Sequence, residues 1–215
     1  MKKIYYKKIF ELLIVTFFPP FIIIFFNIQK LVLPIVILTA ILTFIYLSKK
    51  NYKFGNFLKT KKRDLKKISL RVISVCIILF FLNYFISPET LLIFPYLDFK
   101  LWIVIMILYP VFSAFPQELI FRVFFYERYS VILKNKNLLI FINAFVFAIM
   151  HCIYLNFIIV ILAFCGGIIF ASNYYYNKSV FLVTLEHALI GNFMFSIGLG
   201  QYFFQGNIKY IYSLI

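Results

Sequence analysis

The stretch "LWIVIMILYPVFSAFPQELIFRVFF" (residues 101–125) decides the class of fold, because it is apolar over a length that suits a lipid bilayer. A helix needs about 20 mainly apolar residues to cross the hydrocarbon core, so this stretch predicts a membrane-spanning helix. Its polar interruptions include Gln117, Glu118 and Arg122. Ionisable groups inside a bilayer are costly unless they are paired or face a polar cavity. The stretch therefore predicts a membrane protein and raises the question of a buried polar site.

Apolar runs of this kind recur along the whole chain. Of its 215 residues, 64% are hydrophobic and 13% are charged, whereas a soluble domain carries about 25% charged residues. The runs predict helices near residues 10–28, 30–47, 69–87, 100–116, 117–133, 137–152, 157–176 and 179–197. The fourth and fifth could also form one element bent at Pro116, because proline removes a backbone donor. We expect an all-α, polytopic transmembrane bundle of seven or eight helices that forms one integral membrane domain over residues 1–215.

The basic residues are concentrated outside the apolar runs. The segment "SKKNYKFGNFLKTKKRDLKK" (48–67) holds nine Lys or Arg and one Asp, and "MKKIYYKK" at the N-terminus holds four Lys. By the positive-inside rule, both segments are predicted to lie on the cytoplasmic side, next to anionic lipid head groups. The predicted partner of this charge is thus the lipid bilayer and not a nucleic acid. We expect an integral protein of a bacterial plasma membrane.

A second group of polar residues lies within the apolar runs. Its members are Glu118, Arg122, His151, Glu186 and His187, and the two histidines are the only ones in the chain. Glu118 and Arg122 are four residues apart, so they share a helix face and can pair. Such a pair can also be purely structural, and a single histidine can be a hydrogen-bonded core residue. Because isolated charges are costly in lipid, we expect the five side chains to be gathered at one place.

One carboxylate and two imidazoles on three predicted helices match the ligands of a divalent metal such as zinc. Glu118, His151 and His187 would leave a fourth position open for water, as catalytic zinc sites do. A bound metal lowers the pKa of that water, and a carboxylate can accept the proton. We therefore predict these three residues as metal ligands.

Three short motifs from these segments resemble the CAAX protease and bacteriocin-processing family of intramembrane endopeptidases. The family pattern is EExxxR on one helix, FxxxH on a second, and HxxxN or HxxxD on a third. The chain has "QELIFR" from Gln117 to Arg122, "FAIMH" from Phe147 to His151, and "HALIGN" from His187 to Asn192. The motif core thus spans residues 115–192.

The resemblance implies a glutamate-dependent, metal-dependent protease that cuts peptides or membrane proteins in or near the membrane. It implies catalytic roles for Glu118, His151, His187 and Asn192, with Gln117, Arg122 and Phe147 supporting them. The glutamate pair and the first histidine would handle a water nucleophile. The second histidine and the asparagine would bind metal or stabilise the developing oxyanion, and the arginine would hold the glutamates.

Two departures from the pattern leave the function open. Gln117 replaces the first glutamate, and an amide cannot accept a proton as a carboxylate does. Asn192 lies five residues after His187, which in a regular helix places it roughly 140° from the histidine face; Gly191 could loosen the helix there. The alternative is a non-catalytic relative that binds a peptide or a membrane partner in immunity or export assistance. A transporter with a proton relay is disfavoured, because the chain shows no internal repeat.

Overall fold

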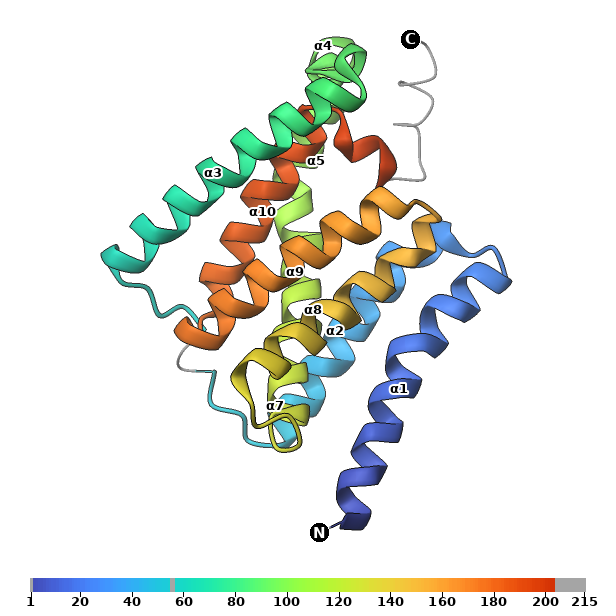
Figure 1. Ribbon diagram of the computed structural model, residues 1–215, viewed down its shortest axis with the longest axis vertical. Coiled ribbons are helices and arrows are strands. Elements are labelled where there is room, and N and C mark those ends of the chain that lie inside the picture. The colour runs from blue at the N-terminus through green and yellow to red at the C-terminus, as the bar shows by residue number, and fades with distance from the viewer. Residues whose placement is uncertain (1, 55–56, 204–215) are drawn as a thin grey trace.

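The computed structural model describes residues 2–54 and 57–203, and this part of the chain forms helices and turns without a strand. The helices pack as a bundle with α1 at one edge and α3 at another (Figure 1). They are α1 (Lys2–Phe25), α2 (Val32–Lys49), α3 (Lys62–Ile86), α4 (Ile93–Leu97), α5 (Phe99–Tyr109), α6 (Phe115–Glu118), α7 (Phe125–Tyr129), α8 (Lys136–Met150), α9 (Phe157–Asn177) and α10 (Val180–Ser196). The predicted all-α fold is confirmed.

Six segments of the described chain are long and apolar enough to cross a membrane. They are Ile4–Phe25, Gln29–Lys49, Lys62–Ile86, Phe99–Tyr129, Lys136–Tyr154 and Phe157–Asn177. Helix α10 is apolar as well, but its 17 residues fall short of the roughly 20 that an upright span requires. Many large apolar side chains are exposed on the outside of the bundle, where lipid tails would cover them. The protein is an integral membrane protein.

The segment Phe99–Tyr129, which we call the central helix, is one continuous span that runs through the bundle. Two wider π-helical turns interrupt its α-helical parts, η4 (Pro110–Ala114) and η5 (Leu119–Phe124). A π turn accommodates a residue that cannot join the ordinary hydrogen-bond ladder, and Pro110 stands at the start of the first one. Of the two alternatives left open by the sequence, the chain thus adopts the single long helix, and Pro116 does not end it.

Side-chain caps explain where four of the helices begin. Asp98 accepts a hydrogen bond from the Leu101 amide at the start of α5, and Asn135, Asn156 and Ser179 cap α8, α9 and α10 in the same way. Asn, Asp and Ser are preferred at this position because their oxygens satisfy amides that have no partner within the helix. These residues therefore set the starts of α5, α8, α9 and α10.

Helices α8 and α9 form a close antiparallel pair (Figure 1). Gly167 makes the approach possible, since a Cβ atom at this position would lie 3.0 Å from the Cα atom of Ala144. Small residues commonly permit such close helix packing in membranes. The short turn η6 (His151–Tyr154) follows α8, so this packing fixes the place of the first histidine.

Several basic segments lie at one end of the bundle. Lys8 of α1 donates to the backbone oxygen of Arg128, and Arg128 in turn donates to the hydroxyl of Tyr46 near the end of α2. The loop that follows α2 reaches the start of α10, where the Phe181 amide donates to the Phe57 oxygen. The start of α1, the described part of the 48–67 loop and the α9–α10 turn are thus on the same side, as the charge pattern predicts.

An ion pair fastens α1 to the central helix. The Arg128 guanidinium donates to both carboxylate oxygens of Glu11, at 2.7 and 2.6 Å, and the Tyr129 hydroxyl adds a bond of 3.1 Å. Much of the remaining α1 surface is exposed, and its buried residues from Ile4 onward are Thr16, Pro20 and Ile23. The polar contact at residue 11 is therefore a main attachment of this helix.

Replacing Glu11 by Ala should loosen α1 and lower the stability of the protein. The pair is about one-third exposed on the arginine side, and such pairs contribute up to about 1 kcal/mol. Thermal unfolding in detergent micelles measures the effect, with Lys7→Ala as the control, because Lys7 is exposed on the same helix. Equal melting temperatures for Glu11→Ala and the control would contradict this attachment.

Candidate active site

The central helix directs Glu118 and Arg122 into the interior of the bundle. Both side chains are completely buried, and Arg122 Nε donates to Glu118 Oε2 at 2.9 Å. The four-residue spacing survives the π turn at Leu119–Phe124, so the pairing predicted from the sequence forms. A buried carboxylate is stable only when its charge is compensated, and Arg122 supplies this charge.

His187 of α10 is bonded to the other oxygen of the same carboxylate. Its Nδ1 lies 2.7 Å from Glu118 Oε1. A carboxylate paired with an arginine accepts hydrogen bonds, so Nδ1 carries the proton of this bond and Nε2 takes no part in it. The imidazole stacks on Phe170 of α9, with ring centroids 4.6 Å apart. Glu118 thus joins two residues that are far apart in the sequence.

Asn143 of α8 completes this buried group from a third helix. Its Oδ1 accepts a hydrogen bond from Arg122, and its Nδ2 donates to the backbone oxygen of Phe121 at 2.5 Å. The Arg122 guanidinium also lies over the ring of Phe147, 4.9 Å from its centroid. We call Glu118, Arg122, Asn143 and His187 the polar frame, because they connect the central helix to α8 and α10.

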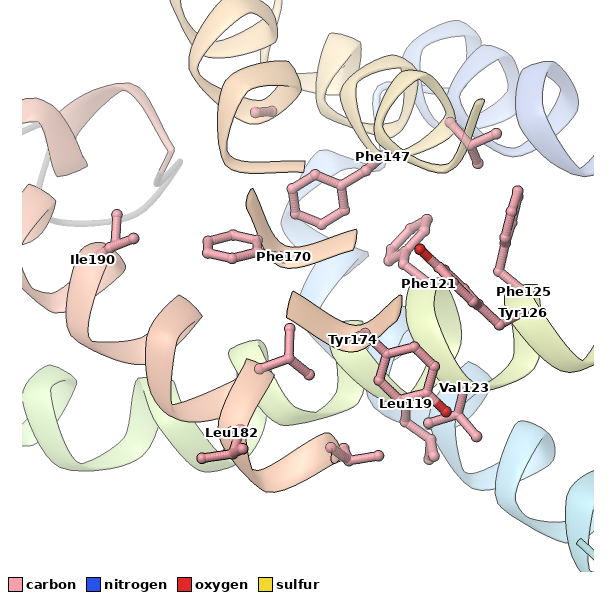
Figure 2. Close-up of a cluster of buried hydrophobic side chains, with 14 of the residues drawn as sticks. Leu119, Phe121, Val123, Phe125, Tyr126, Phe147, Phe170, Tyr174, Leu182 and Ile190 are labelled. Atoms are coloured by element: carbon pink, nitrogen blue, oxygen red, sulfur yellow. The ribbon is translucent and has the colours of Figure 1, made fainter. Parts of the chain in front are cut away.

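His151 lies beyond the end of α8 and does not contact Glu118 directly. Its Nδ1 donates to the backbone oxygen of Phe147 at 2.7 Å, which again leaves Nε2 free. The Phe147 ring is 4.5 Å from the His151 ring and 5.9 Å from the His187 ring. Figure 2 shows Phe147 beside Phe170 within the apolar cluster around the site. The two histidines therefore share Phe147 as a neighbour.

Gln117 faces a different space from Glu118. It lines a cavity of about 180 Å³ together with His151, Tyr154 and mainly apolar side chains of α1, α2 and the central helix. Its Nε2 donates to Ser113 Oγ at 2.9 Å, so its carbonyl oxygen is not used in this bond. Adjacent helical residues point in directions about 100° apart. Position 117 therefore belongs to the cavity, whereas position 118 belongs to the polar frame.

Asn192 lies on the side of α10 that faces α5. Its Nδ2 donates to the backbone oxygen of Met106 at 3.0 Å, and its buried Oδ1 has no hydrogen-bond partner among the described residues. Helix α10 continues without a break through Gly191. A Cβ atom at that position would collide with the ring of Tyr109, so the glycine makes room for this ring. The structure thus does not bring Asn192 to the Glu118–His187 contact.

The segment that contains all these motifs matches a known family. Residues 99–194 match the family model of type II CAAX prenyl endopeptidase Rce1-like proteins. The segment 99–194 therefore belongs to this Rce1-like family. No curated protein and no solved structure matches the chain. The match begins with α5 and ends within α10, and it confirms the family resemblance predicted from the three motifs.

The side chains of the candidate site fit a metal in part. Zinc-bound histidines generally donate their second ring nitrogen to a carboxylate or a backbone carbonyl, and both His187 and His151 do so here. Glu118, by contrast, has both oxygens engaged, by His187 and Arg122. Among the described residues, no three His, Cys, Asp or Glu side chains lie close enough to hold a metal ion. The fit rests on the two imidazoles.

The sequence analysis did not single out three polar residues near the candidate site, which are Arg71, Asn143 and Asn173. Asn143 contacts Arg122, and Glu186 is bonded by Arg71 of α3 and Asn173 of α9 instead of joining the polar frame. Arg71, Asn143 and Asn173 are all polar residues within apolar runs. The signal that singled out the histidines could therefore have found them, although it names no partner.

Replacing Asn143 by Leu should destabilise the protein more than an ordinary helix-surface change. The substitution removes a hydrogen-bond acceptor from the buried Arg122 guanidinium, and hydrogen bonds to charged groups contribute about 1.5–3 kcal/mol. Equilibrium unfolding in mixed detergent micelles measures the loss. Phe141→Leu on the exposed face of α8 is the control. Equal stability of the two variants would show that the frame does not depend on Asn143.

Proposed function

We propose that this Rce1-like protein is an intramembrane peptidase that cuts peptides or membrane proteins at the cavity beside the central helix. The observation that supports the proposal is that Gln117 and His151, which come from two different family motifs, line the same cavity. The family name implies peptide substrates. A mainly apolar cavity within a membrane protein suits an apolar peptide segment.

His151 is the proposed general base. Its Nδ1 is held by the Phe147 backbone oxygen, so Nε2 can accept the proton of a water molecule in the cavity. The carbonyl oxygen of Gln117 would orient this water through a hydrogen bond but would not take its proton. The second carboxylate cannot replace the missing first one, because Glu118 is fully buried in the polar frame. We therefore expect slow catalysis.

The predicted divalent metal, with zinc as the first candidate, remains a proposal. The Nε2 atoms of His151 and His187 would hold it, and Glu118, predicted as the third ligand, would orient His187 through Nδ1. A bound metal would supply Lewis-acid chemistry and a more acidic water. Asn192, with an unpaired Oδ1, stays a predicted site residue on the α5 side.

A non-catalytic function in peptide or membrane-partner binding is the second candidate. The same geometry favours it, because position 117 is an amide and the two oxygens of Glu118 are both engaged. In either function, we propose that the N-terminus and the 48–67 loop face the cytoplasm of a bacterial cell. Their location at one end of the bundle and their positive charge support this orientation.

A peptide-cleavage assay in liposomes should separate the two candidates. Gln117→Glu adds a carboxylate to the cavity and should raise the cleavage rate, because a positioned general base contributes about 10²–10⁴-fold. His151→Ala should lose a factor in the same range. Gln29→Glu in η1 (Gln29–Leu31) makes the same chemical change outside the cavity lining and should leave the rate unchanged.

The peptidase proposal is wrong if neither the parent nor Gln117→Glu cleaves any member of a broad peptide library. Peptide binding by the same non-cleaving parent would then support the non-catalytic function.

A further inference from the structure

Glu186 is a buried carboxylate next to His187 that lies outside the polar frame. It has no exposed surface, and a carboxylate in such a place requires a charged partner. Arg71 of α3 provides it: its Nε bonds Oε1, and its second terminal nitrogen donates to Oε2 at 2.8 Å. Asn173 of α9 donates to the same Oε2 at 2.7 Å. Three helices therefore meet at Glu186.

Asn173 is itself held in one orientation. Its Oδ1 accepts a hydrogen bond of 2.7 Å from Asn177, one turn later on α9. Its Nδ2 also lies 3.3 Å from the backbone oxygen of Leu182 on α10. Asn173 of α9 thus holds the Oε2 atom of Glu186, while Arg71 of α3 supplies the compensating positive charge.

Glu186 and His187 hold α10 from two directions. Consecutive residues of an α-helix point about 100° apart, so Glu186 reaches α3 and α9 while His187 reaches Glu118 on the central helix. A rotation of α10 about its axis would move both side chains away from their partners. The two contacts together define the rotation of the helix.

Apolar packing alone defines this rotation poorly. The sequence of α10, "VFLVTLEHALIGNFMFS", has apolar residues on every side, and a helix of this kind has no single face that must turn inward. Buried polar contacts can select one arrangement among several that are similarly apolar. The Arg71–Glu186 pair is in the right place to do so for His187.

We propose that Arg71 is a positioning residue: through Glu186 it fixes the rotation of α10 and thereby holds the His187 imidazole against Glu118. Arg71 lies outside the segment 99–194 that matches the family model. The N-terminal part of the chain thus contributes to the geometry of the motif core. The functional meaning of this positioning rests on the proposed function, but the contact itself does not.

The two histidines permit a direct test. Nitrogen-15 NMR of histidine-labelled full-length protein in detergent micelles gives one pair of ring signals for each imidazole, assigned with His151→Gln and His187→Gln. The parent should show His187 as a single tautomer with the proton on Nδ1, since Glu118 accepts it. In Arg71→Gln, His187 should lose this single state and show both tautomers, whereas His151 should be unchanged.

A milder variant covers the case in which Arg71→Gln does not fold. Lysine keeps the charge but cannot bind both carboxylate oxygens as a guanidinium does. In Arg71→Lys, His187 should therefore show the second tautomer in a smaller proportion than in Arg71→Gln. If Arg71→Gln does not fold, Arg71→Lys should still show some of this second tautomer, which the parent lacks.

Arg128→Gln is the matched control. Arg128 also forms an Arg–Glu pair with two hydrogen bonds between helices, and its side chain is 31% exposed compared with 35% for Arg71. This variant should lower the melting temperature without changing the His187 tautomer. An unchanged His187 in a folded Arg71 variant, or the same change in Arg128→Gln, would overturn the proposal. Failure of the parent to cleave peptides would count against the peptidase alone, because the NMR signal requires no activity.

Discussion

The structure depends on the compensation of one buried carboxylate. Glu118 accepts a hydrogen bond from Arg122 on its own helix and another from His187 on α10, and Arg122 is bonded in turn to Asn143 on α8. Charged groups at membrane depth are retained only where such partners exist. Because the partners come from three helices, neutralising Glu118 also fixes how these helices sit against one another.

This compensation separates two neighbouring positions of the first motif. Glu118 is enclosed among its partners, whereas Gln117 lines the cavity together with His151. In the account proposed here, the Gln117 departure from the family pattern therefore lies at the cavity, and the polar frame does not include the changed position. Under the proposed function, the protein would keep the polar frame but have a weaker group for activating water.

Much of the fold follows from apolar length, because a bilayer requires long apolar helices. The pairing of Glu118 with Arg122 likewise follows from a four-residue spacing. The partners Arg71 and Asn143 do not follow, since they depend on which helices pack together. The sequence also does not predict which face of the central helix lines the cavity, because two π turns shift the direction of the side chains. For Asn192, regular helical geometry alone predicts a side chain that points away from the His187 face of α10. Its amide donates to the backbone oxygen of Met106 on α5.

The most direct test of the account is a double-mutant cycle between Glu118 and His187, measured by equilibrium unfolding in mixed micelles. Glu118→Gln, His187→Gln and the double variant give the coupling free energy of the two side chains. Residues in contact within one buried network should show a coupling of about 1 kcal/mol or more. Additivity within about 0.5 kcal/mol, as expected for independent sites, would contradict the claim that this bond holds the central helix and α10 together.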